Sequence, residues 1–174
     1  MSRVDGKVAI VSGGARGIGG ETARLLALNG AQVIVADLLE EEGLANAQAI
    51  CDEGGDAIYV NLDVTKSQSW KDAVEVAKRE FGGIDILVNN AGVYISKSIF
   101  DTTQEDFEKL VSVNLEGVFL GTKICAPELI RRAKDAIVGS AIVNLSSAAG
   151  LVGSRNAPVY SMTKGGVRLL TKST

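Results

Sequence analysis

Short apolar runs alternate along the chain with segments in which apolar residues recur at helical spacing. The runs fall at 7–11, 32–36, 57–61, 84–89 and 141–145, and the helical patterns at 21–28, 40–51, 67–81, 102–132 and 159–174. Apolar runs without alternation are typical of strands that are buried on both faces. Strands that alternate with helices predict right-handed crossovers and a doubly wound parallel α/β sheet.

The same pattern predicts which helix positions face the sheet. In 40–51 we expect Leu44, Ala47 and Ile50 to point inward, and in 67–81 a stripe that runs from Trp70 to Phe81. The long region before the fifth run begins at Thr102 or Thr103. We expect it to bend near Asn114, and Pro127 is a second candidate for a kink.

Length and composition restrict the class of protein. The chain has 174 residues, 46% of them hydrophobic, which predicts one globular domain over 1–174. A net charge of −3 offers no basic surface for nucleic acid, and no apolar run reaches membrane-spanning length. Cys51 and Cys125 have no motif spacing, so we expect buried, reduced thiols and a cytoplasmic protein.

The absence of histidine narrows the chemistry. With no His in the sequence, a Ser-His-Asp triad and a His-ligated zinc are both excluded, and we expect no metal site. Any proton transfer has to use Tyr, Lys, Asp or Glu.

A glycine-rich stretch follows the first apolar run and opens the first helical pattern. Gly13 suits a tight turn, Gly17 allows a pyrophosphate to approach the backbone, and Gly19 allows the helix to pack on the preceding strand. The helix N-terminus then offers unpaired N–H groups to an anion. The stretch, which includes Arg16 and Ile18, predicts a phosphate-binding turn, although a glycine turn without a ligand is the alternative.

Asp37 ends the second run, and an acid at this place can accept hydrogen bonds from the ribose of an adenosine. It also repels a 2′-phosphate, so it favours NAD over NADP. Arg16 could meet a 2′-phosphate and keeps NADP open. A helix-capping role for Asp37 is the other alternative.

Two further strand ends carry small or polar residues. Asp63-Val64 suits an adenine contact, or simply a surface turn. The stretch Asn90-Ala91-Gly92 leaves room for a ligand at the end of the fourth run, or forms a plain turn.

Tyr160 and Lys164 are one helical turn apart, so their side chains share a face. A neighbouring ammonium stabilises a phenolate and so helps a tyrosine act as a base. Ser147 lies just after the fifth run and can polarise a carbonyl oxygen held against Tyr160. Alone, a Tyr-x-x-x-Lys pair is also typical of an exposed helix surface.

Together these motifs resemble the short-chain dehydrogenase/reductase family. The resemblance rests on Ser12-Gly13-x-x-x-Gly17-Ile18-Gly19, Asn89-Asn90-Ala91-Gly92, Asn114, Ser147 and Tyr160-Ser161-Met162-Thr163-Lys164, in the family's order. The stretches 117–123 and 142–153 are similar to NAD-linked secondary-alcohol and hydroxysteroid dehydrogenases of that family.

The resemblance implies a role for each catalytic position. Tyr160 would be the acid/base, and Lys164 would stabilise its phenolate and bind the nicotinamide ribose. Ser147 would hold the substrate oxygen, with Ser146 as the alternative. Asn114 would bend its helix and hold a water that relays protons to Lys164. The implied cofactor-binding residues are Gly13, Arg16, Gly17, Ile18, Gly19, Asp37, Asp63, Val64, Asn90, Ala91, Gly92, Tyr160 and Lys164.

We therefore expect a Rossmann-like sheet of strand order 3-2-1-4-5 and reversible NAD-dependent oxidation of a small secondary alcohol to a ketone. The alternatives are an NADP-dependent ketone or 3-oxoacyl reductase and a non-catalytic dinucleotide-binding fragment. The resemblance also implies a homotetramer and two further strands, so we expect the domain to be incomplete at its C-terminus. The run 141–145 would then be an edge strand, and Val167, Leu169 and Leu170 would lose cover.

Overall fold

The sheet has the predicted doubly wound parallel arrangement. The computed structural model describes residues 4–134, 136 and 138–174, so residues 1–3, 135 and 137 of the predicted domain lie outside the described residues. The strands are β1 (Val8–Ser12), β2 (Gln32–Asp37), β3 (Asp56–Asn61), β4 (Ile86–Asn89) and β5 (Ala141–Asn144). They are parallel, and their spatial order is β3-β2-β1-β4-β5. The predicted fold class and strand order are confirmed.

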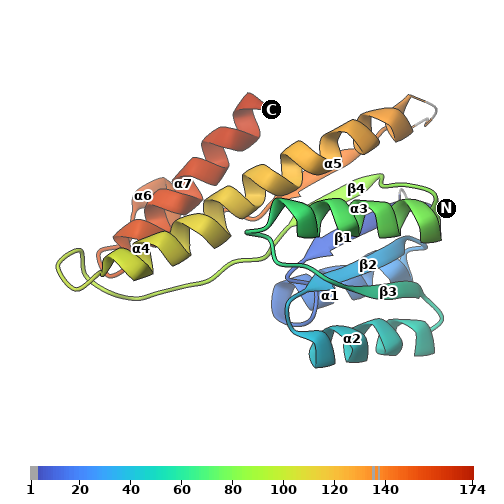
Figure 1. Cartoon of the computed structure of the whole chain (residues 1–174), viewed down its shortest axis with the longest axis horizontal. Coiled ribbons are helices and arrows are strands. Elements are labelled where there is room, and N and C mark those ends of the chain that lie inside the picture. Colours follow the sequence, from blue (N-terminus) through green and yellow to red (C-terminus); the bar gives the residue numbers. More distant parts are fainter. Residues whose placement is uncertain (1–3, 135, 137) are drawn as a thin grey trace.

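Helices cover both faces of this sheet (Figure 1). They are α1 (Gly17–Leu28), α2 (Glu40–Asp52), α3 (Ser67–Phe81), α4 (Gln104–Val111), α5 (Gly117–Ala133), α6 (Ala149–Val152) and α7 (Pro158–Ser173). The π-helical turn η1 (Ser112–Glu116) joins α4 to α5, so an irregular turn lies where we expected a bend. Pro127 lies inside α5 and does not end it.

Two buried clusters form because alternate residues of a strand point to opposite faces. Ile10 of β1 belongs to the cluster that includes Trp70 of α3 and Cys125 of α5. Its neighbour Val11 belongs to the cluster beneath α1 and α2, with Ala23 and Ile50. The strand β1 is therefore buried on both faces, as the apolar run at this place predicted.

Some predicted inward positions are wrong. In α2 the side chain of Leu44 is 52% exposed, because Gly43 and Ala47 take the inward face. The Tyr59 ring lies so close to Gly43 that a Cβ there would collide with it. Cys51, next along the helix from Ile50, is also exposed, although Cys125 is buried as expected.

The last helix is better covered than expected. Val167 is fully buried, because the face of α7 that carries Val159, Thr163 and Lys164 packs against η1 and β5. Leu169 lies on another face and is 62% exposed. The predicted edge position of β5 is confirmed, and its Val143 is 48% exposed.

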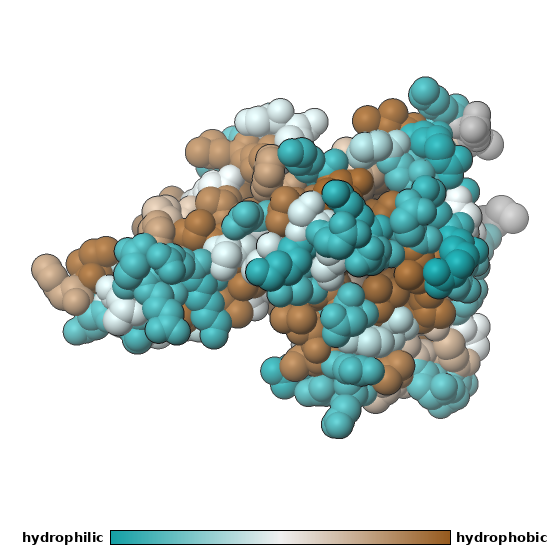
Figure 2. Space-filling model, in the orientation of Figure 1, coloured by the Kyte–Doolittle hydropathy of each residue, from teal (hydrophilic) through white to brown (hydrophobic). Residues whose placement is uncertain are grey.

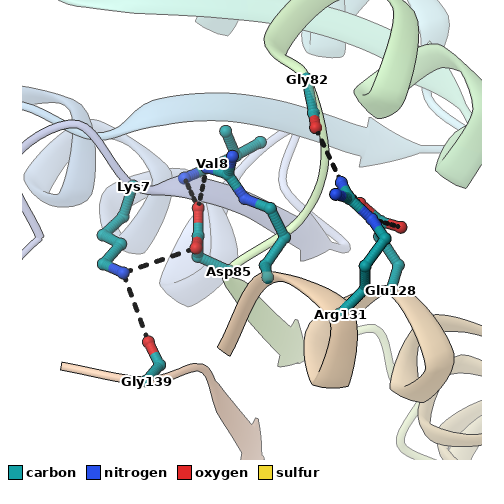
Figure 3. Close-up of polar contacts among 8 residues, drawn as sticks. Lys7, Val8, Gly82, Asp85, Glu128, Arg131 and Gly139 are labelled. Carbon is teal, nitrogen blue, oxygen red and sulfur yellow. Dashed lines mark hydrogen bonds and ion pairs between the residues drawn. The ribbon is translucent and has the colours of Figure 1, made fainter. Parts of the chain in front are cut away.

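The amino ends of the central strands are joined by a charged cluster (Figure 3). The Asp85 carboxylate, 2% exposed, accepts hydrogen bonds from the Val8 N–H at 3.0 Å, from Arg132 Nη2 at 2.7 Å and from Lys7 Nζ at 3.4 Å. Burial alone would raise the pKa of Asp85, but these donors outweigh it and hold the pKa below its usual value. This cluster ties β1 to the segments that flank β4 and β5.

The carboxyl ends of the strands meet at the opposite edge. Ser12 is in register with Ala36 and Asn89, and Asn89 is in register with Asn144. Residues that directly follow these strands therefore lie close together, although they are far apart in the sequence. Ligands of open parallel sheets bind at this edge.

Candidate functional site

A cleft of about 630 Å³ lies at the carboxyl ends of the strands. Its walls come from the glycine turn, from the loops after β2, β3, β4 and β5, and from α4, η1 and α7. They include the predicted residues Gly13, Arg16, Ile18, Gly19, Asp37, Asp63, Val64, Asn90, Ala91, Gly92, Tyr160 and Lys164. Gly17, Asn114 and Ser147, which the sequence also predicted, are not among the lining residues of the described chain.

The glycine turn is packed against the end of β4. Gly13 has φ +66°, and a Cβ there would lie 2.8 Å from the Ala91 Cα. A Cβ on Gly19 would collide with the Gly13 carbonyl and the Asn90 amide. That amide donates hydrogen bonds to the Ser12 and Gly13 carbonyls, at 2.9 and 3.1 Å. The turn therefore needs glycine at these positions to lie this close to the strand ends.

The start of α1 keeps its N–H groups free of side-chain capping. Its N-cap is Arg16, which makes no capping hydrogen bond, and Arg16 itself is exposed. A helix N-terminus of this kind suits an anion.

Asp37 stands at the end of β2 as predicted, and both its oxygens accept backbone hydrogen bonds. Oδ2 accepts from the Ala15 N–H at 3.0 Å, and Oδ1 from the Leu39 N–H at 3.1 Å. The Asp37 carbonyl accepts from the Tyr59 hydroxyl at 3.0 Å. Burial raises the pKa of Tyr59, so this hydroxyl keeps its proton for the bond. The carboxylate is thus fixed beside the glycine turn.

Asp63 forms a turn and also lines the cleft, and the predicted adenine contact stays a prediction. Its Oδ1 accepts hydrogen bonds from the N–H and the hydroxyl of Thr65, at 2.9 and 2.7 Å. The neighbouring Val64 is 7% exposed, and its carbonyl accepts from the Trp70 indole at 3.0 Å. These bonds fix the wall of the cleft beyond β3.

Asn114 is fully buried in η1 and contacts the loop after β4. Its Oδ1 accepts from the Val93 N–H and its Nδ2 donates to the Val93 carbonyl, both at 2.8 Å. A longer contact of 3.5 Å joins Nδ2 to the Thr163 hydroxyl on α7. The π-turn therefore fixes the wall of the cleft, and the predicted role in a water relay stays a prediction.

Tyr160 and Lys164 lie on the cleft-facing side of α7. The Lys164 ammonium donates a hydrogen bond to the Leu145 carbonyl at 2.7 Å and lies 5.9 Å from the centroid of the Tyr160 ring. Lys164 is 5% exposed, and burial lowers its pKa. The end of β5 therefore holds the Lys164 side-chain nitrogen next to the tyrosine.

The two serines after β5 differ in their surroundings. Ser146 lines the cleft, and its hydroxyl donates to the Lys164 carbonyl at 2.8 Å. The Ser147 hydroxyl accepts from the Ala149 N–H at 3.1 Å, at the start of α6. The geometry keeps both serines as candidates for the residue that holds the substrate oxygen.

A comparison with protein-family models identifies the class. The model described as "short chain dehydrogenase" matches residues 7–174. The chain belongs to the short-chain dehydrogenase family. Membership of this family implies a nicotinamide dinucleotide as cofactor.

Curated members of the short-chain dehydrogenase family resemble this chain along its length. Trans-4-hydroxycyclohexanecarboxylate dehydrogenase of Sinomonas cyclohexanicum is 44% identical, over 98% of this chain and 66% of the relative. A 3-alpha-(or 20-beta)-hydroxysteroid dehydrogenase of Mycobacterium tuberculosis is 44% identical, over 99% and 63%. Cyclopentanol dehydrogenase of Comamonas testosteroni is 41% identical, over 99% and 67%.

A solved structure agrees with these relatives. The crystal structure of a short chain dehydrogenase from Mycobacterium avium has a TM-score of 0.90 and 34% identity, over 97% of this chain and 61% of that one. The chain thus spans about two thirds of the length of the relatives it matches.

The sequence analysis did not single out Tyr59 or Tyr94. Tyr59 holds the Asp37 carbonyl, and its place in an apolar strand gave no sign of this. Tyr94 lines the cleft and contacts the Tyr160 ring. An aromatic residue two positions after Gly92, after the end of the fourth run, is the signal that could have pointed to it.

None of the helices in the described part of the chain is long and apolar enough to cross a membrane. Within the same residues, no group of three or more His, Cys, Asp or Glu side chains could hold a metal ion.

Proposed function

We propose that the protein is an NAD-dependent dehydrogenase that reversibly oxidises a secondary alcohol to a ketone. One observation carries this proposal: Tyr160 and the Lys164 ammonium line the same cleft as the glycine turn and Asp37. An acid/base and a dinucleotide site therefore share one cavity.

The residues present fit a nicotinamide dinucleotide. Gly13 and Gly19 form a turn that any Cβ would fill, at the uncapped start of α1, which suits a pyrophosphate. The Asp37 carboxylate, fixed beside this turn, suits a ribose. When bound, the cofactor supplies a hydride acceptor for the alcohol carbon.

The chain's own residues would handle the proton. Tyr160 takes the hydroxyl proton of the alcohol during oxidation and returns it during reduction. Lys164, held by the Leu145 carbonyl, places a positive charge near the ring and stabilises the phenolate. Ser147, or Ser146 in its place, donates a hydrogen bond to the substrate oxygen.

The preference for NAD rests on Asp37. A 2′-phosphate bound at this ribose would lie beside a carboxylate, which repels it. Arg16 lines the same cleft and supports the rival proposal, an NADP-dependent ketone or 3-oxoacyl reductase. Asp37 outweighs Arg16 because Asp37 is held by two backbone N–H groups, whereas Arg16 is exposed.

The relatives suggest the substrate class. Their names describe a hydroxycyclohexane carboxylate, a 3-alpha- or 20-beta-hydroxysteroid and cyclopentanol, all of which contain a hydrocarbon ring. We therefore propose a cyclic secondary alcohol as substrate. We also propose a homo-oligomer, expected as a homotetramer from the resemblance to the family, and a cytoplasmic location, expected from the two cysteines without motif spacing.

A substrate panel tests this function. The full-length protein would be incubated with NAD or NADP and a series of cyclic and acyclic secondary alcohols, while reduced cofactor is followed by absorbance. We expect turnover with NAD and ring alcohols. Reduced-cofactor consumption only with NADPH and ketones would support the rival reductase. Cofactor binding without turnover of any alcohol or ketone would support a non-catalytic binding protein.

A further inference from the structure

We propose that Tyr94 positions the Tyr160 ring and forms the wall against which the hydrocarbon ring of a cyclic alcohol packs. Tyr94 lies in the loop between β4 and α4 and lines the cleft. The proposal extends the proposed function and rests on it.

The two tyrosine rings make an edge contact. Their centroids are 5.0 Å apart and their planes meet at 87°, the T-shaped arrangement that aromatic pairs favour. The Tyr160 hydroxyl makes no hydrogen bond to any residue within the described part of the chain. The direction of the Tyr160 ring therefore depends on packing, and Tyr94 is the aromatic partner in that packing.

The loop holds Tyr94 from both sides. On one side Asn114 forms two hydrogen bonds of 2.8 Å with the backbone of Val93. On the other side the Ser96 hydroxyl donates to the Asn156 carbonyl at 3.3 Å, and Lys97 pairs with Asp106 at 2.6 Å. An anchored ring can fix its neighbour, whereas a freely moving one could not.

Tyr94 also keeps a free aromatic surface. Its side chain remains 61% exposed despite the contact with Tyr160, and it lines the cleft. Since the two rings are 5.0 Å apart, an alcohol whose hydroxyl reaches Tyr160 brings the carbons next to that hydroxyl close to Tyr94. A five- or six-membered ring on the alcohol has a flat apolar face that can cover an aromatic surface, and a short acyclic alcohol has little to place there.

The same loop offers a matched control. Its tip carries Phe100, which is 94% exposed and does not line the cleft, and Figure 2 shows hydrophobic surface at the end of the molecule where this loop lies. Removal of the Phe100 ring changes the loop's aromatic content without changing the contact with Tyr160.

The test compares Tyr94→Ala, Tyr94→Phe and Phe100→Ala in the full-length protein with NAD. Steady-state kinetics are measured for cyclohexanol and for 2-propanol, and NAD affinity by calorimetry. For Tyr94→Ala we expect kcat to fall about threefold to tenfold for both alcohols, because the Tyr160 ring loses its partner. We expect KM to rise about tenfold for cyclohexanol alone, because only the ring alcohol loses a packing surface.

The other variants separate this role from a general loss of structure. Tyr94→Phe keeps the ring and should restore both parameters, Phe100→Ala should match the parent protein, and NAD affinity should be equal in all. Unchanged cyclohexanol kinetics in Tyr94→Ala, or equal KM changes for the two alcohols, would overturn the proposal. A deficit in Tyr94→Phe as large as in Tyr94→Ala would overturn it as well.

A binding measurement distinguishes this failure from failure of the proposed function. If the parent protein turns over no secondary alcohol, the proposed function fails. Titration of cyclohexanol into the NAD-loaded protein still tests the wall, because it needs no turnover. Weaker cyclohexanol binding by Tyr94→Ala than by the parent protein supports packing of the alcohol against Tyr94. Equal binding by the two proteins, or no detectable binding by either, rejects it.

Discussion

The carboxylate of Asp37 accepts a hydrogen bond from the backbone N–H of Ala15 over 3.0 Å. This bond joins the end of β2 to the glycine turn, so a negative charge is fixed beside the proposed pyrophosphate site. The consequence for cofactor choice can be measured directly.

Replacement of Asp37 by Asn should weaken the preference for NAD. The variant keeps an oxygen that can accept one backbone hydrogen bond but removes the charge that repels a 2′-phosphate. We expect the ratio of kcat/KM for NADP to that for NAD to rise roughly tenfold or more, since two like charges about 4 Å apart near a protein surface repel by roughly 1–4 kcal/mol. Glu41→Gln, an equal charge change on the exposed start of α2, is the control. An unchanged ratio in Asp37→Asn, or equal use of both cofactors by the parent protein, would contradict the prediction.

Replacement of Tyr160 by Phe should abolish most turnover while leaving NAD binding nearly unchanged. Phe keeps the ring that packs on Tyr94 but lacks the oxygen that exchanges the proton. General acid/base catalysis contributes roughly 10²–10⁴-fold, so kcat should fall by that order. Kinetics and calorimetric titration with NAD measure the two effects separately. Retained turnover would move the acid/base role to another residue.

A matched pair of variants decides between the two serines. If Ser147 holds the substrate oxygen, Ser147→Ala should lower kcat roughly 10²-fold or more, as loss of one such donor does, while Ser146→Ala should change kcat little. The two residues are adjacent, so each variant is the control for the other. The reverse pattern would assign the role to Ser146, which lines the cleft.

Stability should fall in acid as the Asp85 cluster is protonated. The pKa of Asp85 is lower in the folded chain than in the unfolded chain, where it is near 3.9. Its contribution is therefore complete above about pH 4 and is lost as pH falls through the lower folded value. At neutral pH Asp85→Asn should destabilise the fold by roughly 1–3 kcal/mol, because Arg132 and the Val8 N–H lose a charged acceptor.

Urea unfolding at several pH values measures this effect. The difference between the parent protein and Asp85→Asn should shrink below about pH 4, as the parent loses the same charge. Asp72→Asn, on the exposed face of α3, should show neither the destabilisation nor the pH dependence. A difference that stays constant from pH 7 to pH 2 would show that the charge is not the cause.

Residues 1–174 expressed alone should self-associate through β5. This strand lies at the edge of the sheet, and Val143 on it is 48% exposed. A lysine on an edge strand discourages pairing with another chain. Val143→Lys should therefore reduce the association seen by sedimentation velocity, whereas Val152→Lys on α6, at an 87% exposed valine, should not. A stable, cooperatively unfolding monomer without either change would contradict the prediction.

The fold could be predicted from the sequence because its determinants are local or repeated. The apolar runs marked the strands, and Thr103 forms the capping box expected of a helix start. Which side of a helix faces the sheet was less certain, because it depends on neighbours from elsewhere in the chain. Leu44 is exposed because the Tyr59 ring, from the next strand, occupies the space beside Gly43.

The cleft was predictable where a residue ends a strand, as Asp37 does, or directly follows one, as Asn90 does, because all carboxyl ends meet at one edge. Pairs of residues that loops bring together could not be predicted, because no spacing in the sequence marks them. Tyr94, in the loop after β4, meets Tyr160 of α7, and Asn114 of η1 binds the backbone of the neighbouring Val93. The roles of the site residues, the NAD preference, the cytoplasmic location and the homo-oligomer stay predictions.

The charged cluster around Asp85 lies at one end of β1, and the glycine turn begins at the other, about 13 Å away for a strand of this length. The cluster that stabilises the fold and the proposed substrate site therefore lie at opposite ends of the sheet. Substitutions near Asp85 that raise the free energy of unfolding would let the protein tolerate destabilising changes elsewhere. The loop that carries Tyr94 could then be randomised in a directed-evolution experiment to select for new alcohols. Such a library would be stabilised first at the amino ends of the strands and diversified second at their carboxyl ends.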